Sequence, residues 1–243
     1  NVLAGFDPED PATGHRLLPT LSNVSGDRLD GIRVGTAPSL HLTPLAPAYE
    51  EVFDRALTVA AGLGAEIVEI TVPLAERIRP TFATLQMAEA HYTHSVTLGT
   101  FPSRAADYGP DVRGRLETGA GVGINNYLEA RTEAQRIRRR FETVFELVDV
   151  LLTPVSAGPP AAVPDPDQTT HFGKSIPFRE LVMDYTVPQD ITGLPACAIP
   201  AGFDTDDLPV GVQTTAAAHR EDLALRVAAA LHQQLGSSER WPV

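Results

Sequence analysis

The sequence is poor in the residues that many metal, redox and nucleophilic sites use. Its 243 residues contain one cysteine, Cys197, and one lysine, Lys174. A single cysteine excludes a framework of intrachain disulfides and is compatible with a cytoplasmic location, which we expect. Cys197 lies in an apolar stretch, and this position favours a small core residue over a nucleophile.

Basic charge is also scarce, because the formal net charge is −12 at pH 7. Such a chain has little with which to neutralise phosphates, so we expect no nucleic acid as a partner. The one basic cluster, residues 136–140, is interrupted by Ile137 and followed by Phe141 at helical spacing. This pattern is more typical of a solvated helix face than of a binding patch.

Long apolar runs are missing as well, so no membrane is expected as a partner. Residues 1–5 lack the basic and apolar regions of a signal peptide, and they lack an initiator methionine. We therefore expect Asn1 to be the cut end of a longer chain. His91 and His94 are spaced to share one helix face, but no third ligand accompanies them, so no metal is expected.

What is present is an alternation of strand and helix patterns. Residues 32–35 and 66–70 have strand character, and between them apolar residues recur at helical spacing over 49–63. This βαβ unit predicts two parallel strands. Further helices are expected over 74–98, 111–117, 125–147 and 221–235, further strands over 150–152, 196–200 and 210–215, and a rigid Pro/Ala-rich loop over 154–168.

These elements predict an α/β fold, a mixed β-sheet with α-helices on both faces. Residues 1–30 are rich in proline, glycine and acidic side chains, which is typical of a connecting arm. The remaining residues, 31–243, are expected to form one unit.

One stretch carries most of the functional information. Residues 188–202 are Pro-Gln-Asp-Ile-Thr-Gly-Leu-Pro-Ala-Cys-Ala-Ile-Pro-Ala-Gly, and residues 208–213 are Leu-Pro-Val-Gly-Val-Gln. This order closely resembles the C-terminal half of the amidase-signature hydrolases. Shorter phrases at 4–10, 88–90, 108–113, 130–138 and 149–154 resemble the same family in the same order, so the resemblance runs along nearly the whole chain.

The resemblance implies a hydrolase that cleaves a carboxamide C–N bond without a cofactor. In this family a serine attacks the amide, a second serine in a cis peptide relays its proton, and a neutral lysine is the base. These groups precede the phrase that resembles residues 4–10, so they are expected upstream of Asn1. The implied partners are a small-molecule amide substrate and the missing N-terminal half of the same protein.

Two short segments of this chain contain serine or lysine in an order similar to that of the family's catalytic groups. Gly236-Ser237-Ser238 follows the last helix and lacks the trailing glycines of an oxyanion loop, which favours a frayed tail. Lys174-Ser175 lies between Gly173 and Pro177 in a stretch expected to be a polar loop, whereas a lysine base must be desolvated to lose its charge. We therefore assign no catalytic residue.

Six residues are candidates for contact with substrate. Thr153 and Pro154 leave a strand end, and Met183, Thr186 and Asp190 lead into the next strand; ligands bind at such ends of α/β sheets. Their segments are expected to converge on one cleft. Asp190 stands where the family usually has Asn, and closing a turn through backbone N–H groups is the alternative role.

The sixth candidate, Arg115, rests on the resemblance. In tRNA-dependent amidotransferase A-subunits an arginine near this position and an acid grip the amino-acid substrate. Here the acid's position is Met183, with Asp184 beside it, which argues for a general amidase rather than for glutamine as substrate. A surface or salt-bridged arginine is the alternative for Arg115.

An interpretation from another class stays open. The chain could be a catalytically inert fragment or a module that binds a ligand or partner. Residues 191–199 and 147–162 carry almost no charge, and exposed apolar edges of that kind are normally paired or covered. We therefore expect self-association, as a homodimer.

Overall fold

The computed structural model describes residues 5–10, 13, 28–163, 165 and 167–235. Gly236, Ser237, Ser238 and most of the expected arm over 1–30 lie outside the described residues. The helices are α1 (Pro47–Gly62), α2 (Ala75–Tyr92), α3 (Pro110–Ala120), α4 (Ile124–Leu147), α5 (Phe178–Thr192) and α6 (Glu221–Leu235). Short helical turns lie at η2 (Pro38–Leu40), η3 (Thr93–Thr97) and η4 (Ala105–Asp107).

Five strands form the main sheet in the order β2 (Glu66–Glu69), β1 (Arg33–Thr36), β3 (Val150–Pro154), β7 (Pro209–Ala216) and β6 (Ala196–Phe203). β1 pairs in parallel with both β2 and β3, and β7 pairs antiparallel with β3 and β6. The expected parallel βαβ unit and the mixed sheet are thus confirmed. The two edge strands of this sheet are β2, with four residues, and β6, with eight residues.

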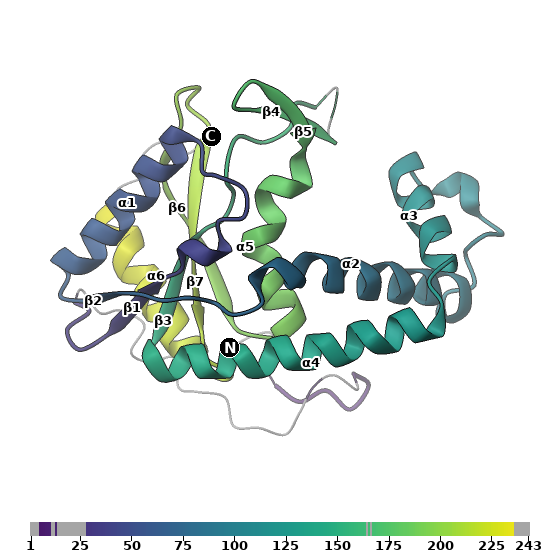
Figure 1. Ribbon diagram of the computed structural model, residues 1–243, viewed down its shortest axis with the longest axis horizontal. Coiled ribbons are helices and arrows are strands. Elements are labelled where there is room, and N and C mark those ends of the chain that lie inside the picture. The colour runs from purple at the N-terminus through teal and green to yellow at the C-terminus, as the bar shows by residue number, and fades with distance from the viewer. Residues whose placement is uncertain (1–4, 11–12, 14–27, 164, 166, 236–243) are drawn as a thin grey trace.

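Helices cover both faces of this sheet, as the sequence predicted (Figure 1). Alternate residues of β3 point to opposite faces. Leu152 packs in the apolar cluster with α1 and α6, whereas Leu151 packs in the cluster with α2, α4 and α5. In Figure 1, α1 and α6 lie to the left of the sheet and α5 to its right.

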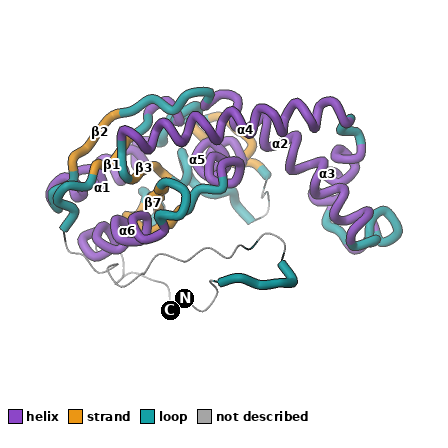
Figure 2. Tube along the Cα trace, turned by 90° about the horizontal axis from the view of Figure 1, so that it is seen from below, coloured by secondary structure: helices purple, strands orange, loops and turns teal. Residues whose placement is uncertain are grey.

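Helices α2, α3 and α4 extend away from the sheet as an arm, with α3 at the far end (Figures 1 and 2). The sequence predicted these three helices within a few residues. Gly119 sits where α3 crosses α2, because a side chain there would collide with the Met87 carbonyl. The arm is therefore held by close backbone contact as well as by apolar side chains.

Two parts of the fold differ from the prediction. Residues 178–192, for which the sequence predicted only a lead into the next strand, form helix α5, although Pro188 lies inside it. The expected polar loop around Lys174 is a two-stranded hairpin of β4 (Gln168–His171) and β5 (Lys174–Pro177). His171 holds this hairpin against the body, since its Nε2 lies 2.8 Å from the Pro44 carbonyl oxygen.

Candidate substrate-binding site

Helix α5 presents three of the six candidate residues on one face. Met183, Thr186 and Asp190 are spaced by three and four residues, which places them on the same side of an α-helix. Met183 and Thr186 are partly exposed and Asp190 is exposed, whereas Tyr185, Pro188 and Gln189 are buried toward the sheet. The first three residues therefore form an outward strip.

Arg115, on α3, lies across a cavity from the first residues of α5. With Asp111 and Pro110 it lines a cavity of about 540 Å³ whose other wall is Asp167, just before β4, with Phe178 and Arg179 at the start of α5. Its Nη2 lies 3.6 Å from Asp111 Oδ2, so the expected alternative of a salt-bridged arginine is also present. The ion pair leaves the Arg115 side chain 41% exposed.

A groove of about 800 Å³ lies between α2 and α4, and Asp190 stands at its α5 end. The start of α5 thus borders the cavity that Arg115 lines, and its last turn borders this groove; we call the outward strip of α5 together with these two depressions the bay. Arg115 and Asp190 line these two depressions, whereas Met183 and Thr186 lie on the strip between them and line neither.

Thr153 and Pro154 do not face the bay. Thr153 is 1% exposed and, like Leu151, points to the α5 face of the sheet. Thr153 pairs with Gln213, whose Nε2 donates to the Tyr185 carbonyl at 3.0 Å. Thr153 and Thr186 therefore lie at the same level rather than at opposite ends of the sheet, but the body of α5 separates them, and the expected single cleft is not formed.

A buried carboxylate fixes α5 in place. The Asp184 side chain is fully buried, and it accepts bonds from Arg79 Nη1 at 3.2 Å and from the Thr43 N–H at 3.0 Å. Burial raises the pKa of Asp184, against the opposing effects of Arg79 and Thr43. Asp184 thus ties α5 to α2 and to the loop before α1, while neighbouring Met183 is partly buried against the apolar cluster of α2, α4 and α5.

Asp190 does not close a turn. It lies in the last turn of α5, and within the described residues its carboxylate accepts no hydrogen bond and makes no ion pair. Instead Gly193 ends the helix with φ at 72°, a conformation that glycine adopts without strain. Desolvation by its neighbours raises the pKa of Asp190. The side chain is therefore available to a ligand at the end of the groove.

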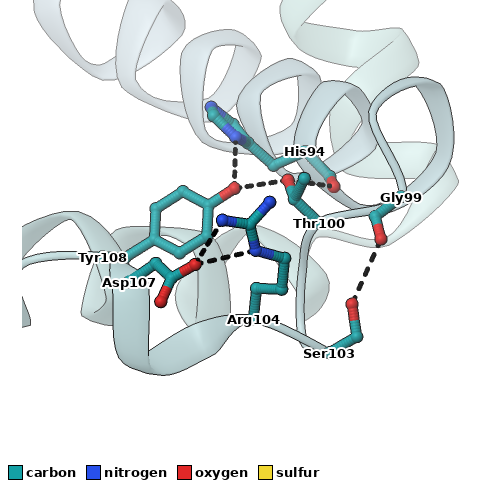
Figure 3. A network of polar contacts seen from close by, with 7 residues as sticks. All are labelled: His94, Gly99, Thr100, Ser103, Arg104, Asp107 and Tyr108. Carbon is teal, nitrogen blue, oxygen red and sulfur yellow. Dashed lines mark hydrogen bonds and ion pairs between the residues drawn. The ribbon is translucent and has the colours of Figure 1, made fainter.

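A polar network at the far end of the arm positions α3 (Figure 3). Tyr108 OH lies 2.9 Å from His94 Nδ1 and 2.5 Å from Thr100 Oγ1. Arg104 and Asp107 form an ion pair beside it at 2.6 Å. These contacts join the end of α2 to the turn that leads into α3. They explain the two neighbouring histidines structurally, because His91 Nδ1 likewise lies 2.9 Å from the Leu116 carbonyl.

Nothing in the described part of the chain resembles an activated nucleophile. Lys174 is exposed on β5, and the Ser175 hydroxyl beside it donates to Gln168 at 3.3 Å. Cys197 is half-buried against the α1–α6 core, and burial raises the pKa of its thiol, which disfavours the thiolate. Across the same residues no three His, Cys, Asp or Glu side chains are placed to hold a metal ion. The bay can hold a substrate, but the described residues supply no group that attacks one.

The structure adds groove residues that the sequence did not single out as site candidates. Glu89 and Tyr127 meet across the seam of α2 and α4, with the Tyr127 hydroxyl donating to Glu89 at 2.9 Å. Arg131 and Arg138 line the α4 side. Arg131 and Arg138 are seven residues apart with Gln135 between them, so they lie on one helix face. This spacing is the feature of the sequence from which the groove could have been predicted.

Comparison with known proteins agrees with the motifs. A sequence profile described as Amidase matches residues 1–225. An amidase of Pseudomonas putida is 32% identical over 210 residues, covering 85% of this chain and 44% of that protein. The A-subunit of the glutamyl-tRNA(Gln) amidotransferase of Nocardia farcinica is 30% identical over 267 residues, covering 97% of this chain and 52% of that protein.

Solved structures share the fold. A chain from a vestigial protein complex that bears on the origins of an s-triazine catabolic enzyme aligns with a TM-score of 0.81 at 26% identity, covering 96% of this chain and 49% of that one. A bacterial aryl acylamidase also reaches 0.81, at 19% identity, covering 100% of this chain and 52% of its own. The chain thus spans about half the length of the relatives that it matches.

Proposed function

The chain belongs to the amidase family, and from that premise we propose that it is the C-terminal part of an amidase that hydrolyses a carboxamide C–N bond. A Ser–cis-Ser–Lys triad upstream of this chain carries out the acyl transfer, and no cofactor takes part. This half supplies walls of the substrate pocket. We also propose that the chain consists of a connecting arm over 1–30 and one folded unit over 31–243, and that the protein is cytoplasmic.

One observation carries the assignment of roles. Arg115 and Asp190 line depressions at the two ends of α5, and Met183 and Thr186 lie on the helix between them, yet the described residues offer no serine beside a desolvated lysine. Such a combination is expected when one half of a protein binds the substrate and the other half supplies the nucleophile and base. In this proposal Thr153 supports the pocket from behind α5, whereas Pro154, which follows Leu152 onto the α1–α6 face of the sheet, contributes only through the end of β3. Within the described ranges, none of the helices is both long and apolar enough to cross a bilayer.

The direct test is an amidase assay on two proteins. The purified chain is expected to release no ammonia from small carboxamides, whereas the same chain expressed with its upstream coding segment is expected to turn them over. Activity of the chain alone that Lys174→Ala or Ser237→Ala abolishes would contradict the proposal. Inactivity of both proteins, with an intact fold, would favour a binding module instead.

A variant pair tests the role of the bay. Arg115→Ala in the longer protein is expected to raise KM at least severalfold, because the guanidinium lines the cavity beside α5. Arg113→Ala is the matched control, since Arg113 lies on the same helix but does not line that cavity. Equal effects of the two substitutions would remove Arg115 from the site.

A further inference from the structure

The interface between α5 and the main sheet contains a layer of polar side chains. Gln213 of β7 pairs with Thr153, whose side chain points to the α5 face, so Gln213 and Thr215 point to that face as well. Gln189 Nε2 on α5 donates to Thr215 Oγ1 at 2.8 Å, and the Tyr185 carbonyl accepts from Gln213 Nε2 at 3.0 Å. Two direct side-chain hydrogen bonds therefore join α5 to β7.

Three atoms of this layer have no hydrogen-bond partner within the described residues. They are Thr153 Oγ1, Gln189 Oε1 and the Tyr185 hydroxyl, and their residues are 1%, 8% and 0% exposed. An unpaired buried polar atom destabilises the folded state, and in native proteins such atoms are mostly bonded to protein or to ordered water. Three of them at one interface therefore indicate a bound partner that both donates and accepts.

His41 adds a fourth unpaired atom next to Tyr185. The two rings lie edge-on with 5.6 Å between their centres, and His41 Nε2 is buried without a partner in the described part of the chain. A tyrosine hydroxyl donates, whereas the unprotonated nitrogen of a neutral histidine accepts. One water molecule between them can accept from the first and donate to the second.

These atoms gather where open α/β sheets bind ligands. Thr153 lies near the end of β3, and His41 lies in the connection that leaves the end of β1, the parallel neighbour of β3. Because Tyr185 packs there with Ala157 and Leu181 and is fully buried, a ligand at this place has to be small. The four atoms belong to uncharged groups, which suits a neutral ligand better than an ion.

Water can reach the layer from the side of β6. Ala198 and Ala196 pair with Gln213 and Thr215, so their side chains point to the same face of the sheet. Both alanines are exposed. Their small side chains therefore leave the rim of the polar layer open to solvent.

We propose that internal water molecules are bound between α5 and the sheet and complete the hydrogen bonds of this layer. They accept from the hydroxyls of Tyr185 and Thr153, and they donate to Gln189 Oε1 and His41 Nε2. A buried water typically makes about two to four such bonds, each nearly as favourable as a direct one. Helix α5 and its outward strip are then held to the sheet through water as well as through direct bonds. This inference does not depend on the proposed amidase function.

Magnetic relaxation dispersion of water nuclei in a solution of the full chain is the direct test, because it detects water molecules that stay bound inside a protein. The wild-type chain is expected to give an internal-water signal that falls in Tyr185→Phe and in Thr153→Val. Tyr108→Phe is the matched control, since the Tyr108 hydroxyl already has His94 and Thr100 as partners, and the signal should stay unchanged. A signal that Tyr185→Phe does not reduce overturns the proposal.

Stability gives a second readout whose sign is decisive. Removing a hydroxyl that is bonded to water is expected to lower the folding equilibrium constant about fivefold, whereas removing an unpaired buried hydroxyl would raise it. A Tyr185→Phe chain at least as stable as the wild type therefore contradicts bound water. If neither variant folds, a high-resolution crystal structure of the wild-type chain decides. Water density within about 3 Å of the Tyr185 and Thr153 hydroxyls supports the proposal, and its absence overturns it.

Discussion

At the scale of single residues, Asp149 joins the end of α4 to β1. Its Oδ1 lies 3.0 Å from Arg33 Nη2, and its Oδ2 accepts the Arg33 N–H at 2.8 Å. The hydrogen bond from the Arg33 side chain is the main cause that holds the pKa of Asp149 below its ordinary value. The stabilisation is therefore complete above the carboxyl pKa of the unfolded chain, and it is lost as the pH falls through the lower folded-state pKa.

Asp149→Asn is expected to lower the free energy of unfolding by about 1 kcal/mol at pH 7, the usual size of a part-exposed charged hydrogen bond. Denaturant unfolding measured from pH 7 down to pH 2 checks this. The difference from the wild-type chain should shrink once Asp149 itself is protonated. Asp165→Asn, at an exposed loop position, is the control and should change little. A difference that stays constant at every pH would contradict the assignment.

His41 also destabilises the folded state when it is protonated, but through burial of a charge rather than through loss of an ion pair. Its ring packs edge-on against Phe53 and Tyr185, and its Nε2 is buried without a hydrogen-bond partner among the described residues. Burial lowers the pKa of His41 despite the attraction of Glu50 and Asp184. The folded state thus prefers the neutral ring, and stability is lost as the pH falls below the ordinary histidine pKa toward the lower folded-state value.

His41→Phe is expected to remove this loss while it keeps an aromatic ring between Phe53 and Tyr185. Thermal unfolding of both proteins at several pH values between about 7.5 and 5 measures the effect, because this range brackets the ordinary histidine pKa of about 6.5. The wild-type Tm should fall more steeply with pH than that of the variant. Parallel curves would mean that another histidine, or none, is responsible.

At the scale of elements, the crossing of α2 and α3 depends on one missing side chain. A Cβ at Gly119 would collide with the Met87 carbonyl and press on His91, whereas a Cβ at Gly114 on the same helix meets nothing. Gly119→Ala is expected to destabilise the chain by about 2 kcal/mol, since overpacking forces the helices apart. Gly114→Ala is expected to be neutral or to stabilise by up to about 1 kcal/mol, because alanine favours a helix.

Urea unfolding of the two alanine variants provides the measurement, and hydrogen exchange over residues 87–120 locates the change. Loss of protection confined to the arm in Gly119→Ala would show that α2 and α3 open while the sheet stays folded. Equal stability of the two variants would mean that the arm adjusts its crossing freely. In that case Arg115 would not be held at a fixed distance from α5.

At the scale of the whole molecule, the expected apolar contact surfaces are only partly exposed. Val150 to Pro154 are buried inside the sheet. The large apolar side chain that is exposed within 147–162 is Leu147, with 56% of its surface accessible; Val163, just after this segment, is 93% accessible. At the start of β6, in contrast, Ala196 and Ala198 are exposed at the edge of the sheet. Self-association is therefore expected through the first residues of β6 rather than through both segments.

Sedimentation at low micromolar concentration tests this homodimer. The wild-type chain is expected to associate, and Ala198→Lys is expected to restore a monomer, because a lysine on an edge strand blocks pairing with another chain. Ala162→Lys adds the same charge to an exposed loop and is expected to leave association unchanged. A wild-type chain that is monomeric, with little exposed apolar surface, would refute the expected dimer.

Much of the architecture could be predicted from local patterns. Strong periodicity marked α1 and α4, and the short connection through α1 required β1 and β2 to be parallel. Helix α5 escaped prediction because Pro188, threonines and valine disfavour a helix locally. Its helical form depends on the Asp184–Arg79 ion pair and on the burial of Tyr185 and Gln189 against the sheet. The β4–β5 hairpin escaped because its short strands carry no clear apolar alternation.

The sequence by itself determined the family and most of the alternating strands and helices, because these depend on residue identity and near-neighbour spacing. Only the tertiary structure decided which candidates meet. It turned Met183, Thr186 and Asp190 outward on one helix, buried Thr153 behind that helix, and brought Arg115 to the same bay from a distant arm. The physical reason is that a side chain's direction follows from the element it belongs to and from what that element packs against, and residues far apart in the chain make those contacts.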